Sequence, residues 1–126
     1  MNNTHVHTNG TGITLNGTSA SVNMTLRDVI VDTNSVNGVV VTSGATHAGA
    51  TVDRSTLAFN GVNGLAVVGT GSVALIGNST VTGNGTGVAA APGSTLLSFK
   101  NNQVAGNVSD GTPMTAFPGP GGTPLQ

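Results

Sequence analysis

The sequence has no cysteine, tryptophan, tyrosine or glutamate, and few charges of either sign. Without cysteine the chain forms neither disulfides nor thiolate metal sites. Lysine and arginine together number three, so the basic surface that nucleic-acid binding requires is missing. No apolar run approaches the about 18 residues of a membrane-spanning segment, and no signal peptide is visible. The sequence therefore predicts neither nucleic-acid binding nor membrane insertion.

The chain is instead rich in glycine, asparagine, threonine, serine and valine. Low charge and 20 glycines fit disorder, but disorder also needs low hydrophobicity, and 37% of the residues are hydrophobic. Many of these are β-branched valines, which favour strands, while Asn and Gly favour tight turns. A chain of 126 residues is expected to form one domain made of many short strands.

One pattern recurs along the whole chain: an asparagine, a few further residues, a glycine, and then alternating apolar residues. The anchor asparagines are Asn9, Asn34, Asn60, Asn84 and Asn107, and the anchor glycines are Gly12, Gly38, Gly64, Gly87 and Gly111. The steps between the glycines are 26, 26, 23 and 24 residues. We expect these residues at corners of the fold, where glycine allows a positive φ and asparagine bonds to the local backbone.

Positions at fixed distances from these anchors are almost purely apolar. Val31, Leu57, Val81 and Val104 stand three residues before the asparagines, and Phe99 falls in the same column as Ile76, eight before. The same alignment places Ser55, Ser79 and Asn102 at a second corner, where they are expected to form a short hydrogen-bonded ladder. The predicted core consists of Leu26, Val31, Val39, Val41, Val52, Leu57, Leu65, Val67, Ile76, Val81, Val88, Phe99 and Val104.

This periodicity predicts an all-β fold, a right-handed parallel β-helix of about four to five coils with 24–26 residues each. A single coil cannot bury its inward side chains, whereas coils stacked about 4.8 Å apart pair every strand with its equivalents and build a continuous core. Residues 1–112 are predicted to form the coils and residues 113–126 a Pro/Gly-rich tail, because proline cannot donate to a strand ladder.

The N-terminal end of the predicted solenoid lacks a recognisable cap. Met1 falls in mid-coil, so the chain is expected to be a fragment of a longer β-helix, or to have its open end covered by another copy. The tail is expected either to cap the last coil or to run along its side.

The repeat, for example residues 76–88 with the sequence IGNSTVTGNGTGV, resembles the right-handed parallel β-helix proteins. This group includes the pectate lyases and the periplasmic NosD-like proteins, and the resemblance covers roughly residues 1–111. It implies a fold that many unrelated activities share. An extracellular or periplasmic location is compatible with it, but the sequence assigns no compartment. The calcium-binding acidic cluster of the pectate lyases is not matched.

The few charges also align between coils. Arg27 falls beside Asp53, and Asp28 falls beside Arg54. We predict that these four residues form surface ion pairs that fix the coil register, each worth under about 1 kcal/mol. A sugar-acid site, with arginine as base or carboxylate clamp, is the functional alternative for the same residues.

Two histidines flank Val6 and are expected to point outward together. Such a pair as His5 and His7 can bind a transition metal, but no carboxylate or third histidine lies nearby in the sequence. We therefore expect a solvated pair, and we predict no catalytic residue, no metal and no cofactor.

Outward positions after the anchor glycines become small and apolar along the later coils. Such a face usually marks a contact surface. The predicted interface residues are Val40, Ala66, Val68, Ala89 and Ala91. The leading hypothesis is accordingly a non-catalytic structural or interaction module that forms homo-oligomers. The alternative is a polysaccharide-binding or polysaccharide-active β-helix whose site is degenerate or missing.

Overall fold

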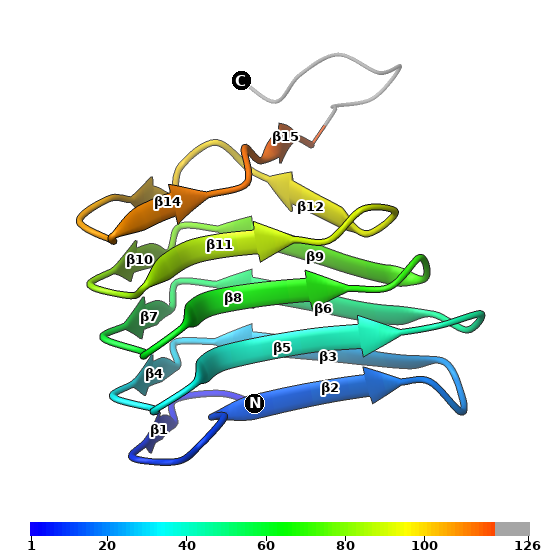
Figure 1. Cartoon of the computed structure of the whole chain (residues 1–126), viewed down its shortest axis with the longest axis horizontal. Helices are drawn as coiled ribbons and strands as arrows, with labels where there is room; N and C mark the ends of the chain where they lie inside the picture. The colour runs from blue at the N-terminus through cyan, green and yellow to red at the C-terminus, as the bar shows by residue number, and fades with distance from the viewer. Residues whose placement is uncertain (118–126) are drawn as a thin grey trace.

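The structure is a computed structural model that describes residues 1–117. Within these residues the chain forms strands β1 to β15 and no helix. The strands wind into a parallel β-solenoid, so the predicted all-β solenoid architecture is confirmed (Figure 1).

Each turn contributes one strand to each of three five-stranded parallel sheets. The first sheet contains β1 (His5–His7), β4 (Ile30–Asp32), β7 (Thr56–Ala58), β10 (Thr80–Thr82) and β13 (Gln103–Val104). The second contains β2 (Ile13–Gly17), β5 (Asn37–Ser43), β8 (Asn63–Val68), β11 (Thr86–Ala90) and β14 (Ser109–Gly111). The third contains β3 (Val22–Arg27), β6 (Ala48–Asp53), β9 (Ser72–Gly77), β12 (Thr95–Ser98) and β15 (Thr115–Ala116).

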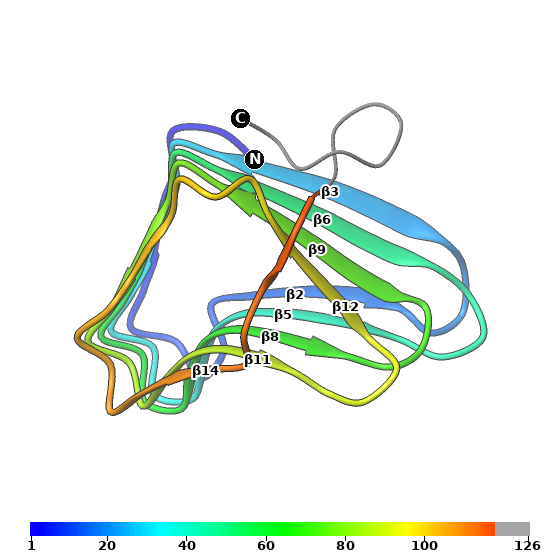
Figure 2. The ribbon, with the colours of Figure 1, turned by 90° about the horizontal axis from the view of Figure 1, so that it is seen from above.

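Viewed from above, the coils superimpose around one elongated cross-section (Figure 2). The short first sheet closes one end, and the second and third sheets form the two long sides. Because successive side chains of a strand point to opposite faces, each strand sends alternate residues inward. The stacked inward residues then form one continuous apolar core.

Most of the residues predicted for the core are completely enclosed. Val104 is half-buried and packs against the edge of this cluster. The predicted residues that are at most 1% exposed are Leu26, Val31, Val39, Val41, Val52, Leu57, Leu65, Val67, Ile76, Val81 and Val88.

The last coil is offset by one residue from the sequence alignment. Ser98, and not Phe99, pairs with Ile76 in the third sheet. The inward hydroxyl of Ser98 accepts hydrogen bonds from the Lys100 backbone N–H at 2.9 Å and from Asn102 Nδ2 at 2.9 Å, so this polar side chain is satisfied at a core position. In the second sheet Gly111 likewise pairs with Val88 rather than with an anchor glycine.

Phe99 therefore lies outside the core, which corrects its predicted place. Its ring covers the outer side of Gly77, where an added Cβ would stand 2.7 Å from a ring atom. The ring also packs on Phe117, with ring centroids 5.5 Å apart. A large side chain is accommodated here because the neighbouring coil has only a glycine beneath it.

The predicted tail begins as a strand. After Gly111 the chain crosses directly from the second sheet to the third, and Thr115 and Ala116 pair with Leu97 and Ser98 (Figure 2). Residues 115–116 thus extend the third sheet although they follow Pro113. The rest of the predicted tail, residues 118–126, lies outside the described residues.

The burial of the third sheet predicts a sharp contrast between two aspartate substitutions. Ile76 is 0% exposed between coils, so Ile76→Asp should cost more than about 4 kcal/mol and abolish cooperative folding, because no partner is available for a buried carboxylate. Thr80 points outward on β10 beside Thr56 and Gln103, so Thr80→Asp should cost about 1 kcal/mol or less. Thermal unfolding of both variants tests this; similar melting temperatures would contradict the assigned faces.

Candidate functional site

An asparagine ladder runs through the solenoid at the corner between the first and second sheets. It consists of Asn9, Asn34, Asn60, Asn84 and Asn107. The Asn60 backbone N–H and Nδ2 both donate to Asn84 Oδ1 at 2.9 Å, and Nδ2 also donates to the Val31 carbonyl at 3.1 Å. Asn60 is 2% exposed. The ladder therefore satisfies, inside the protein, corner backbone groups that have no strand partner.

The anchor glycines provide the space for this ladder. A Cβ at Gly64 would lie 2.9 Å from Asn84 Nδ2 and 2.7 Å from the Gly87 carbonyl oxygen. Gly12, Gly38 and Gly87 are equally crowded by the next ladder asparagine. None of these four glycines has a positive φ, so the prediction that they are needed to allow a positive φ is wrong. They are required for close packing.

Positive φ occurs instead at the residue directly before each ladder asparagine. Beta-branched and aromatic residues rarely adopt this conformation, and the ladder holds them there. The residues and angles are Thr8 at 60°, Thr33 at 49°, Phe59 at 54°, Gly83 at 68° and Gly106 at 75°.

The second hydrogen-bonded row that the sequence predicted is present. The Val29 N–H donates to Ser55 Oγ at 3.1 Å, the Ser55 N–H to Ser79 Oγ at 3.1 Å, and the Ser79 N–H to Asn102 Oδ1 at 3.0 Å. Within residues 1–117 every buried side-chain nitrogen or oxygen has a hydrogen-bond partner. The buried polar side chains of the described residues are thus all bonded within the protein, and none is left without a partner.

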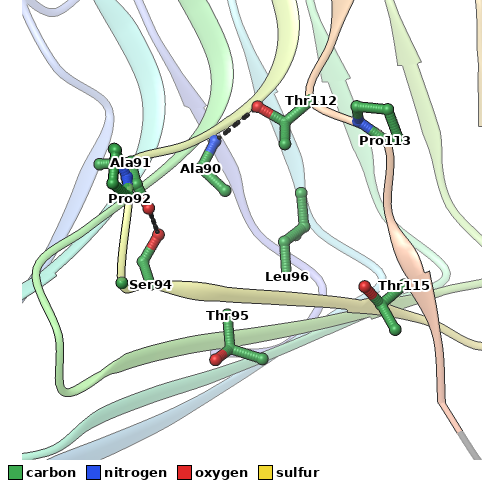
Figure 3. Close-up of a pocket in the computed structure, with 10 residues that line it drawn as sticks. Ala90, Ala91, Pro92, Ser94, Thr95, Leu96, Thr112, Pro113 and Thr115 are labelled. Atoms are coloured by element: carbon green, nitrogen blue, oxygen red, sulfur yellow. Dashed lines mark hydrogen bonds between the residues drawn. The ribbon is translucent and has the colours of Figure 1, made fainter.

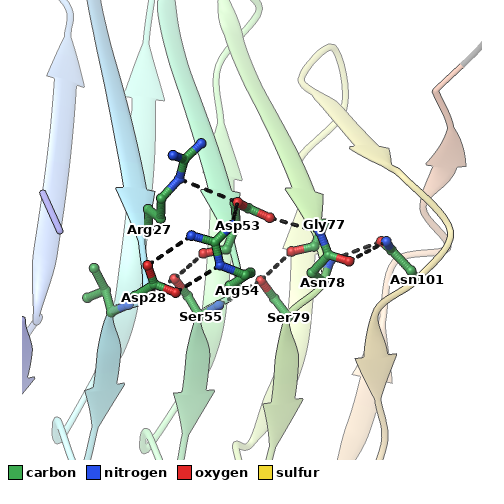
Figure 4. Close-up of polar contacts among 10 residues, drawn as sticks. Arg27, Asp28, Asp53, Arg54, Ser55, Gly77, Asn78, Ser79 and Asn101 are labelled. Atoms are coloured by element: carbon green, nitrogen blue, oxygen red, sulfur yellow. Dashed lines mark hydrogen bonds and ion pairs between the residues drawn. The ribbon is translucent and has the colours of Figure 1, made fainter. Parts of the chain in front are cut away.

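The four aligned charges form one cluster on the outer corner between the third and first sheets (Figure 4). Arg54 holds Asp28 through two hydrogen bonds of 3.0 Å, from Nε and Nη2, and contacts Asp53 Oδ2 at 3.2 Å through Nη1. Arg27 Nε lies 3.5 Å from the same Asp53 oxygen. The cluster continues to Asn78, whose Nδ2 donates to Asp53 Oδ1 at 2.9 Å.

The electrostatics of this cluster favour a structural role. The hydrogen bond from Arg54 lowers the pKa of Asp28, and the bond to Asp28 raises the pKa of Arg54. A guanidinium with a raised pKa stays protonated and is unable to accept a proton as a catalytic base. Both carboxylates already bind arginine, so the cluster links coils and does not present a free acid–base pair.

In the structure a carboxylate lies beside the histidine pair, although it is distant from both histidines in the sequence. Asp32 is the strand neighbour of His7, and its Oδ1 lies 3.0 Å from His5 Nε2. The hydrogen bond to His5 lowers the pKa of Asp32. The His5 and His7 rings are 4.5 Å apart. Nevertheless, within residues 1–117 no three histidine, cysteine or acidic side chains are arranged to hold a metal ion.

The residues predicted for an interface share the outer face of the second sheet. Val40, Ala66 and Ala89 are direct neighbours on β5, β8 and β11. Ala66 is 6% exposed and Val68 44%, while Val40, Ala89 and Ala91 are half-buried. The other outward residues on these strands are uncharged. The result is a flat, uncharged surface, called here the small-residue face.

A hollow of about 360 Å³ opens where the chain crosses from the second to the third sheet (Figure 3). It is lined by backbone and by small side chains, among them Ala90, Ser94, Leu96, Thr112 and Thr115. A smaller hollow of about 180 Å³ lies on the outer face of the third sheet, beside Gly49 and His47. His47 Nε2 is engaged with Asn23 Oδ1 at 3.2 Å. Neither hollow brings an acid together with a base.

No family model, curated protein or solved structure matches this chain. Kinship with the pectate-lyase-like or NosD-like β-helices therefore stays a prediction. In the described part of the chain no helix is long and apolar enough to cross a membrane.

The asparagine ladder predicts a large effect of Asn60→Ala. This substitution removes four side-chain hydrogen bonds and leaves the buried Asn34 backbone N–H without its acceptor. We expect a loss of about 3 kcal/mol or more, measured by urea denaturation. Asn63→Ala is the matched control, because the side chain of Asn63 donates one hydrogen bond, to Asn37 Oδ1, and its loss should cost about 1 kcal/mol. Equal losses of unfolding free energy in the two variants would contradict the larger contribution assigned to the asparagine ladder.

The charge cluster predicts a pH-dependent effect of Asp28→Asn. Asn is acceptable at this corner, where φ is 54°. Because Arg54 lowers the folded-state pKa of Asp28 below its ordinary value of 3.8, the stabilisation is present above that value and is lost as the pH falls through the folded-state pKa. The melting temperature of the variant should be below that of the wild type at neutral pH, and the difference should close in strong acid. In an Arg54→Gln background the difference at neutral pH should be much smaller, because only the charge of Arg27 still lowers the pKa of Asp28.

Proposed function

We propose that this protein is a non-catalytic β-solenoid module that self-associates through the small-residue face. The observation that carries the proposal is the flat, uncharged outer surface of β5, β8 and β11, formed by Val40, Ala66, Val68, Ala89 and Ala91. Association on this face would bury apolar atoms without removing any charged group from water, which is the costly part of burying a surface.

The location of the face supports an isologous contact with a second copy. Its strands belong to the central coils, whose core residues are completely buried, so the face is held on a rigid support. A two-fold contact brings the same patch of each copy together, and a flat patch of small side chains is self-complementary without rearrangement. Right-handed winding and kinship with other parallel β-helices belong to the same proposal, since parallel crossovers are right-handed in nearly all cases.

Polysaccharide binding is the second candidate, and the exposed ring of Phe59 favours it. This side chain is 63% exposed at the corner between the first and second sheets. Part of the ring lies against Gly83 of the next coil, where an added Cβ would stand 2.5 Å from a ring atom. An exposed aromatic ring offers an apolar surface on which a sugar ring can stack.

Sedimentation velocity over a range of concentrations tests the proposed function. The wild type should form a discrete oligomer, and Val68→Arg should weaken association by about tenfold or more, because it places a charge in the contact. Val68 is exposed, so the variant should keep its melting temperature.

Thr80→Arg on the outer face of the first sheet is the matched control and should associate as the wild type does. A wild type that stays monomeric at every concentration would contradict the proposal. So would equal association of the two arginine variants. A monomer that binds members of a glycan panel would favour the polysaccharide alternative.

A further inference from the structure

Six asparagines of this chain are followed directly by glycine, and this dipeptide is chemically reactive. They are Asn9, Asn16, Asn37, Asn60, Asn63 and Asn84. The backbone nitrogen of the glycine attacks the side-chain Cγ of the asparagine, a C–N bond closes a five-membered succinimide, and ammonia leaves. Water then opens the ring at either carbonyl to give aspartate or isoaspartate. Glycine favours the reaction because it has no side chain to hinder ring closure and its backbone is flexible.

The fold blocks this reaction at the buried ladder positions. The attacking nitrogens are engaged, since the Gly61 N–H donates to the Asn34 carbonyl at 2.9 Å and the Gly85 N–H to the Asn60 carbonyl at 3.3 Å. The leaving amide of Asn84 is also held, by the Leu57 carbonyl at 2.9 Å and by Asn107 Oδ1 at 3.0 Å. Ring closure at Asn60 or Asn84 therefore requires prior opening of the coil.

Three further Asn–Gly pairs are restrained by strand structure. Gly17, Gly38 and Gly64 are buried within β2, β5 and β8, where the extended backbone is fixed by its neighbours. Asn63 is tied to Asn37 by a side-chain hydrogen bond of 2.8 Å. The exposed Asn16 accepts hydrogen bonds from the Thr18 N–H at 2.9 Å and from the Thr18 hydroxyl at 2.7 Å.

Asn9 differs from the other five. It is exposed, and Gly10 lies outside the strands with no atom within 4 Å of an added Cβ. Among residues 1–117 no acceptor pairs with the Gly10 N–H, and no donor contacts Asn9 Oδ1. The side chain is held only through Nδ2, by the His7 carbonyl at 2.9 Å and Asn34 Oδ1 at 3.3 Å.

We propose that Asn9 is the site of spontaneous deamidation in the folded protein, with water as the only co-reactant. Conversion to aspartate replaces the Nδ2 donor with an oxygen that faces Asn34 Oδ1, so an attractive contact becomes repulsive. Conversion to isoaspartate inserts an extra methylene into the backbone of the corner between β1 and β2. Either product weakens the first ladder contact and loosens the first coil, while the inner ladder stays intact. This inference does not depend on self-association.

Peptide mapping by mass spectrometry on the full chain, aged at mildly alkaline pH, tests the proposal. In the folded protein Asn9 should convert at least about tenfold faster than Asn60 or Asn84, because these two react only after local opening. In urea-unfolded protein the three rates should become similar. An Asn9 rate in the folded protein no higher than the Asn60 rate would overturn the proposal.

The variant Gly10→Ala should change the rate of deamidation at Asn9 without changing the stability of the fold. The added methyl group has room and φ is not positive, so the melting temperature should be unchanged, whereas conversion of Asn9 should slow by about tenfold because a side chain hinders ring closure. Gly44→Ala, also at an open position, is the matched control and should leave the Asn9 rate unchanged. Equal Asn9 rates in the two variants would also overturn the proposal.

Discussion

The asparagine ladder is the interaction on which the rest of the solenoid depends. At a corner the backbone leaves the strand geometry, and its polar groups would be buried without partners. Each inner ladder asparagine solves this for three neighbours at once: it accepts from the coil before it, donates to the coil after it, and donates to a strand carbonyl, as Asn60 does. Because the carboxamide of the following coil's asparagine sits where a Cβ would otherwise stand, Gly38 and Gly64, the second residues of their strands, must be glycine. One constraint thus explains two columns of the repeat.

The sequence predicted the corner positions of the asparagines and the central coils because these constraints recur in every copy, but it did not predict that these asparagines bond from coil to coil. Asparagine, glycine and an inward aliphatic residue recur every 23 to 26 residues from residue 9 to residue 88, and the strands pair there as expected. The role of the glycines was misjudged, because a sequence shows that glycine is needed but not whether φ or space requires it. Only the structure distinguishes the two requirements, because it shows crowding at Gly64 and a positive φ at Thr33.

The last coil and the histidine cluster escaped prediction for different physical reasons. Apolar Phe99 fits a core column better than Ser98 does, yet Ser98 is tolerated inside because local donors satisfy its hydroxyl, and Phe99 gains Phe117 outside. The contact between His5 and Asp32 spans 27 residues, so it exists only once the coils are stacked in register. The ion pairs of Arg27 and Arg54 could be predicted from the alignment of the repeats, because opposite charges fall at matching positions in adjacent coils.

Stability in such a stack should vary along its axis, since each coil contacts only its neighbours. The inward residues of the first sheet show this gradient: Val31, Leu57 and Val81 are completely buried, whereas Val6 and Val104 in the outermost strands are half-buried. Local opening is therefore expected to begin at the end coils. The small-residue face lies on β5, β8 and β11, in the protected middle of the stack. A contact surface placed there keeps its shape when an end coil opens, whereas Asn9, in the first coil, is subject to each such opening.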